Sequence, residues 1–304
     1  MIHEPIAEPV IHDLEHEHLH EHRMPYTWFT IRTLLQTALS FGVFYLAFPN
    51  IFMAEMTQPW KIVLWAFLFG LPMSLFEYLY HRYLLHSAVL PFLGAMHDAH
   101  SEHHGLTAVK AAVRKKEPEL LVPVKSEYSI ECDEQEASMM FPWFALPVFH
   151  FSLVLVFGLA AKKIWPNEPI YAGLLISVTL YFAAYEIWHA ILHLPFKQFW
   201  QPMMQKRFGR VVEFIYSFHL MHHWRPTANV AVVGLWGVAL WDHVFRTHHR
   251  PKRLPVNGNQ VNYYDAALPK PFFPINIMDR WQAGMYKGSR AVERSFLGIF
   301  TRKK

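Results

Sequence analysis

Residues 60–104 read WKIVLWAFLFGLPMSLFEYLYHRYLLHSAVLPFLGAMHDAHSEHH, and this stretch decides the fold. Its first part, Trp60–Tyr80, has one Lys and one Glu among apolar and aromatic residues, and about 20 such residues suffice to span a bilayer. Histidines follow in a spaced pair and a dense cluster: His81 and His86, then His97, His100, His103 and His104. Neutral imidazole binds iron, zinc, copper and nickel, so the stretch predicts a metal site at the end of a membrane span.

Three other apolar runs have the length of a membrane span. They are Thr27–Phe48, Phe141–Ala161 and Pro169–Ile187. The short connections Pro49–Pro59 and Lys162–Glu168 join the four runs in pairs. The sequence therefore predicts an all-α integral membrane fold, with four transmembrane helices in two hairpins and a cytoplasmic helical cap that holds a histidine-coordinated di-metal centre.

Composition agrees with contact with lipid. Hydrophobic residues make up 53% of the 304 residues, and charged residues make up 17%, below the ~25% of a typical soluble domain. Four buried helices of a soluble protein are the alternative, but apolar runs this long are rare in soluble cores. The net charge of +4 suits an anionic membrane surface at least as well as nucleic acid, and no nucleic-acid-binding signature is present. We therefore expect a membrane partner and no nucleic acid.

The distribution of Lys and Arg predicts the sidedness. Pro49–Pro59 contains neither residue, and Lys162–Glu168 contains two lysines, whereas the segments after each hairpin are rich in both. The side with more Lys and Arg is normally cytoplasmic. We expect a multi-pass protein with both termini and all histidine clusters on the cytoplasmic side.

Three regions differ in composition. Residues 1–25 form a His- and Glu-rich tail that is too polar to pack, so we expect it to be disordered, with weak metal gathering as the alternative. Residues 26–250 form the expected membrane-embedded di-metal domain, and residues 251–304 form a basic cytoplasmic or interfacial extension. The apolar run Ala228–Trp241 is too short to cross a bilayer and predicts a buried or interfacial helix.

The histidine pattern repeats after the second hairpin. His189 and His193 form a spaced pair, and His219-Leu-Met-His222-His223 forms a second H-x-x-H-H cluster. Both halves of the chain therefore read span, span, spaced pair, H-x-x-H-H. This order indicates a degenerate internal duplication.

Helical spacing explains most of these histidines. Residues at i, i+3 and i+4 share a helix face, which covers both H-x-x-H-H clusters and the pair His189 and His193. His81 and His86 are five apart, about 140° around a helix, and serve one site only if the helix frays or each ring enters from a different angle. Ten imidazoles exceed what one ion binds, so we expect two metal ions.

Other polar residues near the clusters have weaker roles. His97 has no equivalent in the second half and is a possible additional ligand. His150, inside a span, is interpreted as a packing residue, and His243 with its neighbours as a basic interfacial patch. Four carboxylates are candidates to orient the imidazole rings by hydrogen bonds: Glu77, Asp98, Glu102 and Glu186.

These clusters, in this order, resemble the fatty acid hydroxylase / sterol desaturase superfamily of membrane di-iron enzymes, over about residues 60–250. Its motifs H-x4-H, H-x2-H-H, H-x3-H and H-x2-H-H are filled here by the ten histidines. An Asn after the last box and a W-D-x-x-F-G-T-like end correspond to Asn229 and Trp241–Thr247, which adds Asn229 and Asp242 to the candidates for supporting residues. The chain departs from the pattern at Arg246, which replaces the usual Gly, in a longer segment Gly105–Met140, and at Leu194.

The resemblance implies an activity, a cofactor and partners. It implies O2-dependent hydroxylation or desaturation of a membrane lipid, such as a fatty-acyl chain or sterol-like lipid, at two Fe ions, although Zn can occupy imidazole sites in purified protein. The chain has no nicotinamide or flavin motif, and its one cysteine, Cys132, cannot form a cluster. A separate electron donor, a ferredoxin or a cytochrome b-type protein, is therefore expected.

Two other classes of function remain open from the residues alone. A zinc-dependent membrane hydrolase would need an open metal position and a general base, for which Glu102 is the candidate. A metal transporter or sensor would explain the His-rich tail, and His150 is then the candidate ligand inside the membrane. Analysis of bound metal distinguishes the first two classes.

Overall fold

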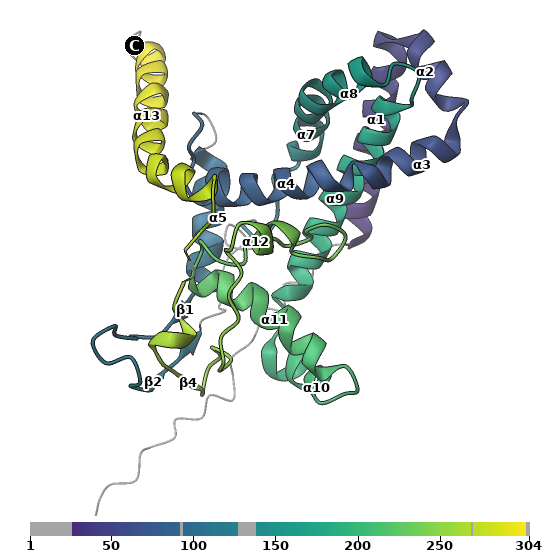
Figure 1. Cartoon of the computed structure of the whole chain (residues 1–304). Coiled ribbons are helices and arrows are strands. Elements are labelled where there is room, and N and C mark those ends of the chain that lie inside the picture. The colour runs from purple at the N-terminus through teal and green to yellow at the C-terminus, as the bar shows by residue number, and fades with distance from the viewer. Residues whose placement is uncertain (1–25, 92–93, 127–137, 269, 302–304) are drawn as a thin grey trace, which may run out of the picture.

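The fold is described from a computed structural model, which covers residues 26–91, 94–126, 138–268 and 270–301. The chain is mostly helical (Figure 1), with long apolar helices gathered at one end and short helices and strands at the other. The predicted disordered tail 1–25, the acidic run 127–137 and Cys132 lie outside the described residues.

Three helical segments in the described part of the chain are long and apolar enough to cross a membrane. Pro59–Leu85 joins α3 (Pro59–Leu68), α4 (Gly70–Tyr80) and the π-helix η1 (His81–Leu85). Ala145–Ile164 joins α7 (Ala145–Leu153), the π-helix η2 (Val154–Gly158) and α8 (Leu159–Ile164), and the third segment is α9 (Ile170–Leu192). These segments correspond to the second, third and fourth predicted spans.

The first predicted span is a helix but does not meet the same criterion. It forms α1 (Tyr26–Ala47), where Arg32, Gln36 and several hydroxyl residues reduce the apolar character. Four spans are therefore not established among the described residues. The connection after α1 also differs from a simple turn, because it contains α2 (Pro49–Met56).

Polar contacts join α1 to the membrane-capable helices. The imidazole of His150 in α7 is buried, and its Nδ1 lies 2.8 Å from Oγ of Ser40 in α1. Its Nε2 lies 3.0 Å from Oγ1 of Thr179 in α9, and Thr179 also contacts Thr37 at 3.0 Å. The interpretation of His150 as a packing residue is confirmed, because it joins three helices.

The short elements form a layer below α4 in Figure 1, which we call the cap. Its helices are α5 (Gly94–Leu106), η3 (Phe196–Trp200), α10 (Gln201–Met204), α11 (Gly209–Trp224), α12 (Leu240–Val244) and the short η4 (Tyr263–Asp265). The cap also contains two small antiparallel sheets, a departure from the all-α expectation. Strand β1 (Val109–Lys110) pairs with β3 (Lys125–Ser126), and β2 (Val122–Pro123) pairs with β4 (Gln260–Val261). The last helix is α13 (Ile275–Thr301).

The predicted helix at Ala228–Trp241 is wrong for most of its length. Only its last two residues, at the start of α12, are helical, and the rest forms turns with positive φ at Gly234 and Gly237. The backbone N–H groups of Val232, Val233 and Gly234 donate instead to the carboxylate of Glu77, at 2.6–2.9 Å. A helix would need most of those N–H groups for itself. We call residues 228–234 the anchored loop.

Candidate metal centre

A π-helix brings the first two histidines onto one face. In η1 the N–H of His86 donates to the carbonyl of His81 at 3.3 Å, a bond between residues i and i+5 instead of i and i+4. The two rings therefore stack, with centroids 5.1 Å apart and planes at 15°. The five-residue spacing is thus explained without fraying of the helix.

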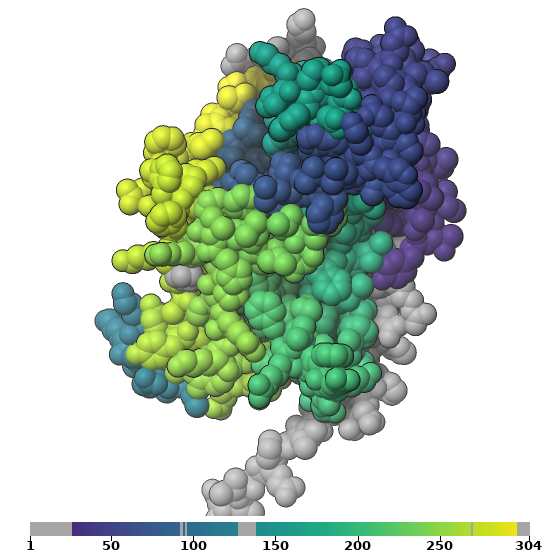
Figure 2. Space-filling view, turned by 45° about the vertical axis from the view of Figure 1, so that its right-hand side comes forward, coloured from purple at the N-terminus to yellow at the C-terminus, as the bar shows by residue number. Residues whose placement is uncertain are grey.

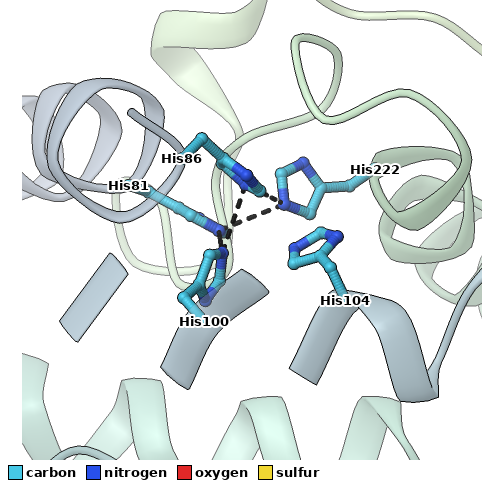
Figure 3. A group of neighbouring side chains, drawn as sticks. All are labelled: His81, His86, His100, His104 and His222. Carbon is cyan, nitrogen blue, oxygen red and sulfur yellow. Dashed lines mark hydrogen bonds between the residues drawn. The ribbon is translucent and has the colours of Figure 1, made fainter. Parts of the chain in front are cut away.

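Within the described ranges, two groups of side chains could hold a metal ion, and five histidines form the first. One ring nitrogen from each lies within 4.8 Å of the others. The rings come from η1, from the residue after it, from α5 and from α11, and they point toward a common centre (Figure 3). The members are His81, His86, His100, His104 and His222.

The second group lies beside the first. It joins His103 of α5 to His189, His193 and His223, again with nitrogens within 4.8 Å. His219 adjoins this group, because its Nε2 lies 2.9 Å from Nε2 of His193 and 3.1 Å from Nε2 of His223. All ten predicted histidines are therefore brought together in two adjacent groups.

Each of the two metal-capable groups contains one histidine from the H-x-x-H-H cluster of the other half of the chain. In the first H-x-x-H-H cluster, His100 and His104 join the first group, but His103 joins the second. In the second cluster His223 stays with its own half, but His222 joins the first group. The first and last histidines of each cluster lie about 40° apart around the helix, whereas the middle one lies about 60° and 100° from them, so it can face a different group.

Ring contacts repeat between the groups, as an internal duplication predicts. His100 and His104 have centroids 4.6 Å apart, and so do their counterparts His219 and His223. At the boundary, His104 and His223 stack on one another with centroids 4.2 Å apart and planes at 19°. Equivalent residues meet there, so the centre is approximately symmetric.

Burial keeps these rings neutral. It lowers the pKa of His222 to about 4 and the pKa of His100 and His104 well below the usual value. The pKa of His219 and His223 is lowered in the same way, first by burial and then by neighbouring imidazoles. Neutral imidazole is the form that binds metal ions.

Backbone carbonyls determine which nitrogen carries the proton. The carbonyl of Val230 lies 2.6 Å from Nδ1 of His81, and that of Ala228 lies 3.0 Å from Nδ1 of His222. Because a carbonyl only accepts, both Nδ1 atoms donate, and both Nε2 atoms have a free lone pair in the neutral rings. These two Nε2 atoms lie only 3.1 Å apart. Two lone pairs at this distance repel each other, and a cation between them would remove the repulsion.

The arrangement of nitrogens fits a metal ion. The Nε2 atoms of His81, His86, His100 and His222 form a closed ring with sides of 3.1–3.2 Å (Figure 3). The centre of a flat ring of this size lies about 2.2 Å from each nitrogen, near the length of a zinc–imidazole bond. Both ring nitrogens of His104 are buried and have no hydrogen-bond partner in the described part of the chain. The donor set therefore fits a cation, without identifying the metal.

Thr107 has the same orienting role in the second group, and the sequence pattern did not predict it. Its hydroxyl donates to the carbonyl of His103 and accepts from Nδ1 of His223, both at 2.7 Å. The Nε2 atom of His223 therefore has a free lone pair. Thr107 follows His103 by four residues, so helical spacing was a signal that could have found it.

The sequence suggested that Glu77, Asp242 and Asn229 orient imidazole rings directly. In the structure they bind the backbone instead. Glu77 and Asp242 accept backbone N–H groups of the anchored loop, with Asp242 bound to Val230 and Ala231 at 2.9 Å. Asn229 donates to two backbone carbonyls in α11 and after α12. These residues hold the loop whose carbonyls orient His81 and His222.

The remaining carboxylate candidates lie elsewhere. Asp98 pairs with Arg290 of α13 at 3.1 Å, and Glu102 is exposed. Glu186 accepts from the backbone N–H of Phe141 at 3.0 Å. None of these contacts orients an imidazole ring.

His97 and Arg246 have contacts of their own. Nδ1 of His97 lies 2.7 Å from the carbonyl of Leu85, and its ring faces Tyr286 of α13, so it joins neither group. Arg246 has a φ of 55°, in the left-handed region that favours glycine. The backbone at this position therefore has a conformation that glycine adopts most easily, which agrees with the Gly usual at this place in the motif.

Two cavities adjoin the histidines. The larger lies among α4, α7 and α9, and its lining is mostly apolar but includes His81. The other is lined by His100 and His189, one from each group. Phe141 and Tyr185 line both cavities, so these two side chains lie between one cavity and the other.

Comparison with known proteins gives no assignment. No family of known proteins, no curated protein and no solved structure matches this chain. Its function is therefore inferred from the membrane-capable helices, the two histidine groups and the cavities.

Proposed function

We propose that this protein is an integral-membrane lipid oxygenase, which hydroxylates or desaturates a fatty-acyl chain or sterol-like lipid with O2 at two histidine-bound irons. The observation that carries the proposal is the pair of adjacent, all-imidazole groups beside an apolar cavity among membrane-capable helices. The histidine motifs that resemble those of membrane di-iron enzymes support the same class.

Two bound irons would supply an oxidant strong enough to remove hydrogen from an unactivated C–H bond. The protein contributes position and exclusion of water. Phe76, Phe149 and Phe182 line the larger cavity and offer an apolar surface to a hydrocarbon chain. Tyr185 lines that cavity beside the centre, with its ring centroid 6.2 Å from that of His81 and 5.5 Å from that of His189. We infer that Tyr185 positions the reacting carbon.

Electrons would come from a separate ferredoxin or cytochrome b-type protein. The Lys and Arg residues of the cap side would attract an acidic carrier. We propose that this side and both termini are cytoplasmic. Labelling of single cysteines placed at Gln58 and Asn167, from outside intact cells, tests this; labelling at Lys125 alone would reverse the orientation.

One observation favours a second candidate, a zinc-dependent hydrolase. Glu186 lines the cavity that contacts both groups, and its Oε2 has no hydrogen-bond partner among the described residues. It could act as a general base, whereas Glu102, the candidate that the sequence offered, is exposed. Metal transport or sensing has no comparable support, since His150 is engaged by Ser40 and Thr179.

Metal analysis combined with lipid mass spectrometry tests the proposal. Cells that express the protein should contain a lipid that has gained one oxygen or lost two hydrogens, and a His104→Ala variant should not make it. A His243→Ala variant, changed at an exposed histidine outside both groups, is the matched control. Purified protein with zinc that hydrolyses a lipid without O2 would instead establish the hydrolase.

A further inference from the structure

Helix α13 packs on the core through Ile275 and Met278 in its first turn, and beyond that turn it is attached through polar contacts. Arg82 binds Asp279 of α13 with two hydrogen bonds, at 2.7 and 3.0 Å, and the side chain of Arg82 is buried. Further along, Arg290 pairs with Asp98 of α5 at 3.1 Å. Gln282 binds Ser87. These contacts fix the rotation of α13 about its own axis.

The fixed rotation leaves an apolar stripe of α13 exposed. Trp281, Met285, Val292 and Phe296 are 66%, 47%, 52% and 47% exposed. Their spacing of four, seven and four residues places them within about 60° on one helix face. The centre of this face lies about 130–150° around the helix from Asp279 and Arg290, and about 70° from Gln282. Beyond its first turn, α13 therefore exposes these apolar side chains instead of packing them on the core.

Besides its polar contacts and the apolar stripe, α13 has a basic stripe. Arg280, Lys287 and Arg294 recur every seven residues and are all exposed. The centre of this basic stripe lies about 150° around the helix from the centre of the apolar stripe, so the two stripes lie on nearly opposite sides. An apolar face opposed by Lys and Arg is the pattern of helices that lie in the plane of an anionic membrane surface.

We propose that α13 is an interfacial helix whose apolar stripe inserts into the acyl boundary of the bilayer, with its basic stripe toward anionic headgroups. Figure 1 shows α13 standing clear of the other helices, on the same side of α4 as α7 and α8. Figure 2, turned by 45°, again shows it at the level of the apolar helices and away from most of the cap. Lipid is the occupant because the chain already has three membrane-capable helices and because the basic stripe complements anionic headgroups.

The proposal has a consequence for the metal centre. Arg82 follows His81 directly and binds Asp279, so α13 is joined to η1 by a buried ion pair. Insertion of the stripe would therefore fix the height of the histidine groups relative to the bilayer surface.

Spin labels on the full-length protein test the position of α13. Cys132 is replaced by Ser, and single cysteines are placed at Met285 or Val292 in the apolar stripe and at Lys287 in the basic stripe. Each labelled protein is reconstituted in vesicles of phosphatidylcholine with one quarter phosphatidylglycerol. Collisions with O2, which concentrates in lipid, and with a water-soluble nickel chelate are then compared.

We expect several-fold more O2 than nickel collisions at Met285 and Val292, and the reverse at Lys287. Equal accessibility at the two stripes would overturn the proposal. So would labels at Met285 and Val292 that neither reagent reaches, because a second copy or another protein would then cover the stripe. Vesicles without phosphatidylglycerol should hold the apolar labels less deeply; an unchanged depth would overturn the role of the basic stripe.

Discussion

The crossing of His222 and His103 predicts how paired substitutions affect metal content. Removal of a residue that merely supports a ligand typically costs 10–100-fold in affinity, about 1.4–2.8 kcal/mol, and loss of a ligand itself should cost at least as much. His222→Ala removes an Nε2 that lies 3.1 Å from those of His81 and His86. It should therefore empty the first group while the second retains its ion.

Two double variants then separate spatial grouping from order in the sequence. His222→Ala with His81→Ala affects only the first group, so metal content should stay at about one ion per chain. His222→Ala with His223→Ala alters a single sequence cluster but removes one member of each group, so metal content should fall toward zero. Elemental analysis after dialysis against a weak chelator measures the content, and His243→Ala serves as control.

The opposite ranking would refute this grouping. If the double variant at His222 and His81 lost both ions while the double variant at His222 and His223 kept one, each sequence cluster would bind its own ion. A His222→Ala protein that kept two ions with unchanged affinity would refute the assignment of His222 as a ligand.

Four further predictions concern the surroundings of the centre. Glu77→Ala leaves three buried N–H groups of the anchored loop without an acceptor, which should lower the free energy of unfolding by roughly 3 kcal/mol or more, measured as a lower thermal midpoint. Asp279→Asn leaves Arg82 without its charged partner and should cost roughly 3 kcal/mol, the low end for a buried pair because Asp279 is 26% exposed; an unchanged midpoint would contradict this. His150→Ala should lower the thermal midpoint without changing metal content, since the ring joins helices; loss of an ion would make it a ligand. Deletion of residues 1–22 should leave metal content and lipid product unchanged, and loss of one ion would show that the tail contributes ligands.

The identity of the clustered histidines could be predicted from sequence, but their division into two groups could not. Helical spacing shows that His100, His103 and His104 lie near one another, and it says nothing of which ring faces a helix from the other half of the chain. That depends on tertiary packing, which places His103 with His193 and His222 with His86.

Hydropathy predicted a helix at Ala228–Trp241, but most of this run is a loop. An apolar run of this length is equally consistent with a helix and with a buried loop. The backbone forms a loop here because the carboxylates of Glu77 and Asp242 accept its N–H groups. Glu77 is distant in sequence, and Asp242 lies just after the run. Assigning those carboxylates directly to imidazoles failed for the same reason, because their partners are main-chain atoms that no side-chain pattern reveals.

The π-helix at His81–Leu85 has a bearing on how the two halves are related. A π-turn is an α-helix that has accepted one extra residue. The corresponding pair in the second half, His189 and His193, lies at the end of an uninterrupted α-helix with one residue fewer between the two histidines. If both halves descend from one ancestral unit, a single codon gained or lost between the two histidines accounts for the difference. Elsewhere in a helix such a change would rotate every following side chain by about 100°. Here the turn confines the change to five residues, so the ancestral spacing could drift without separating the rings.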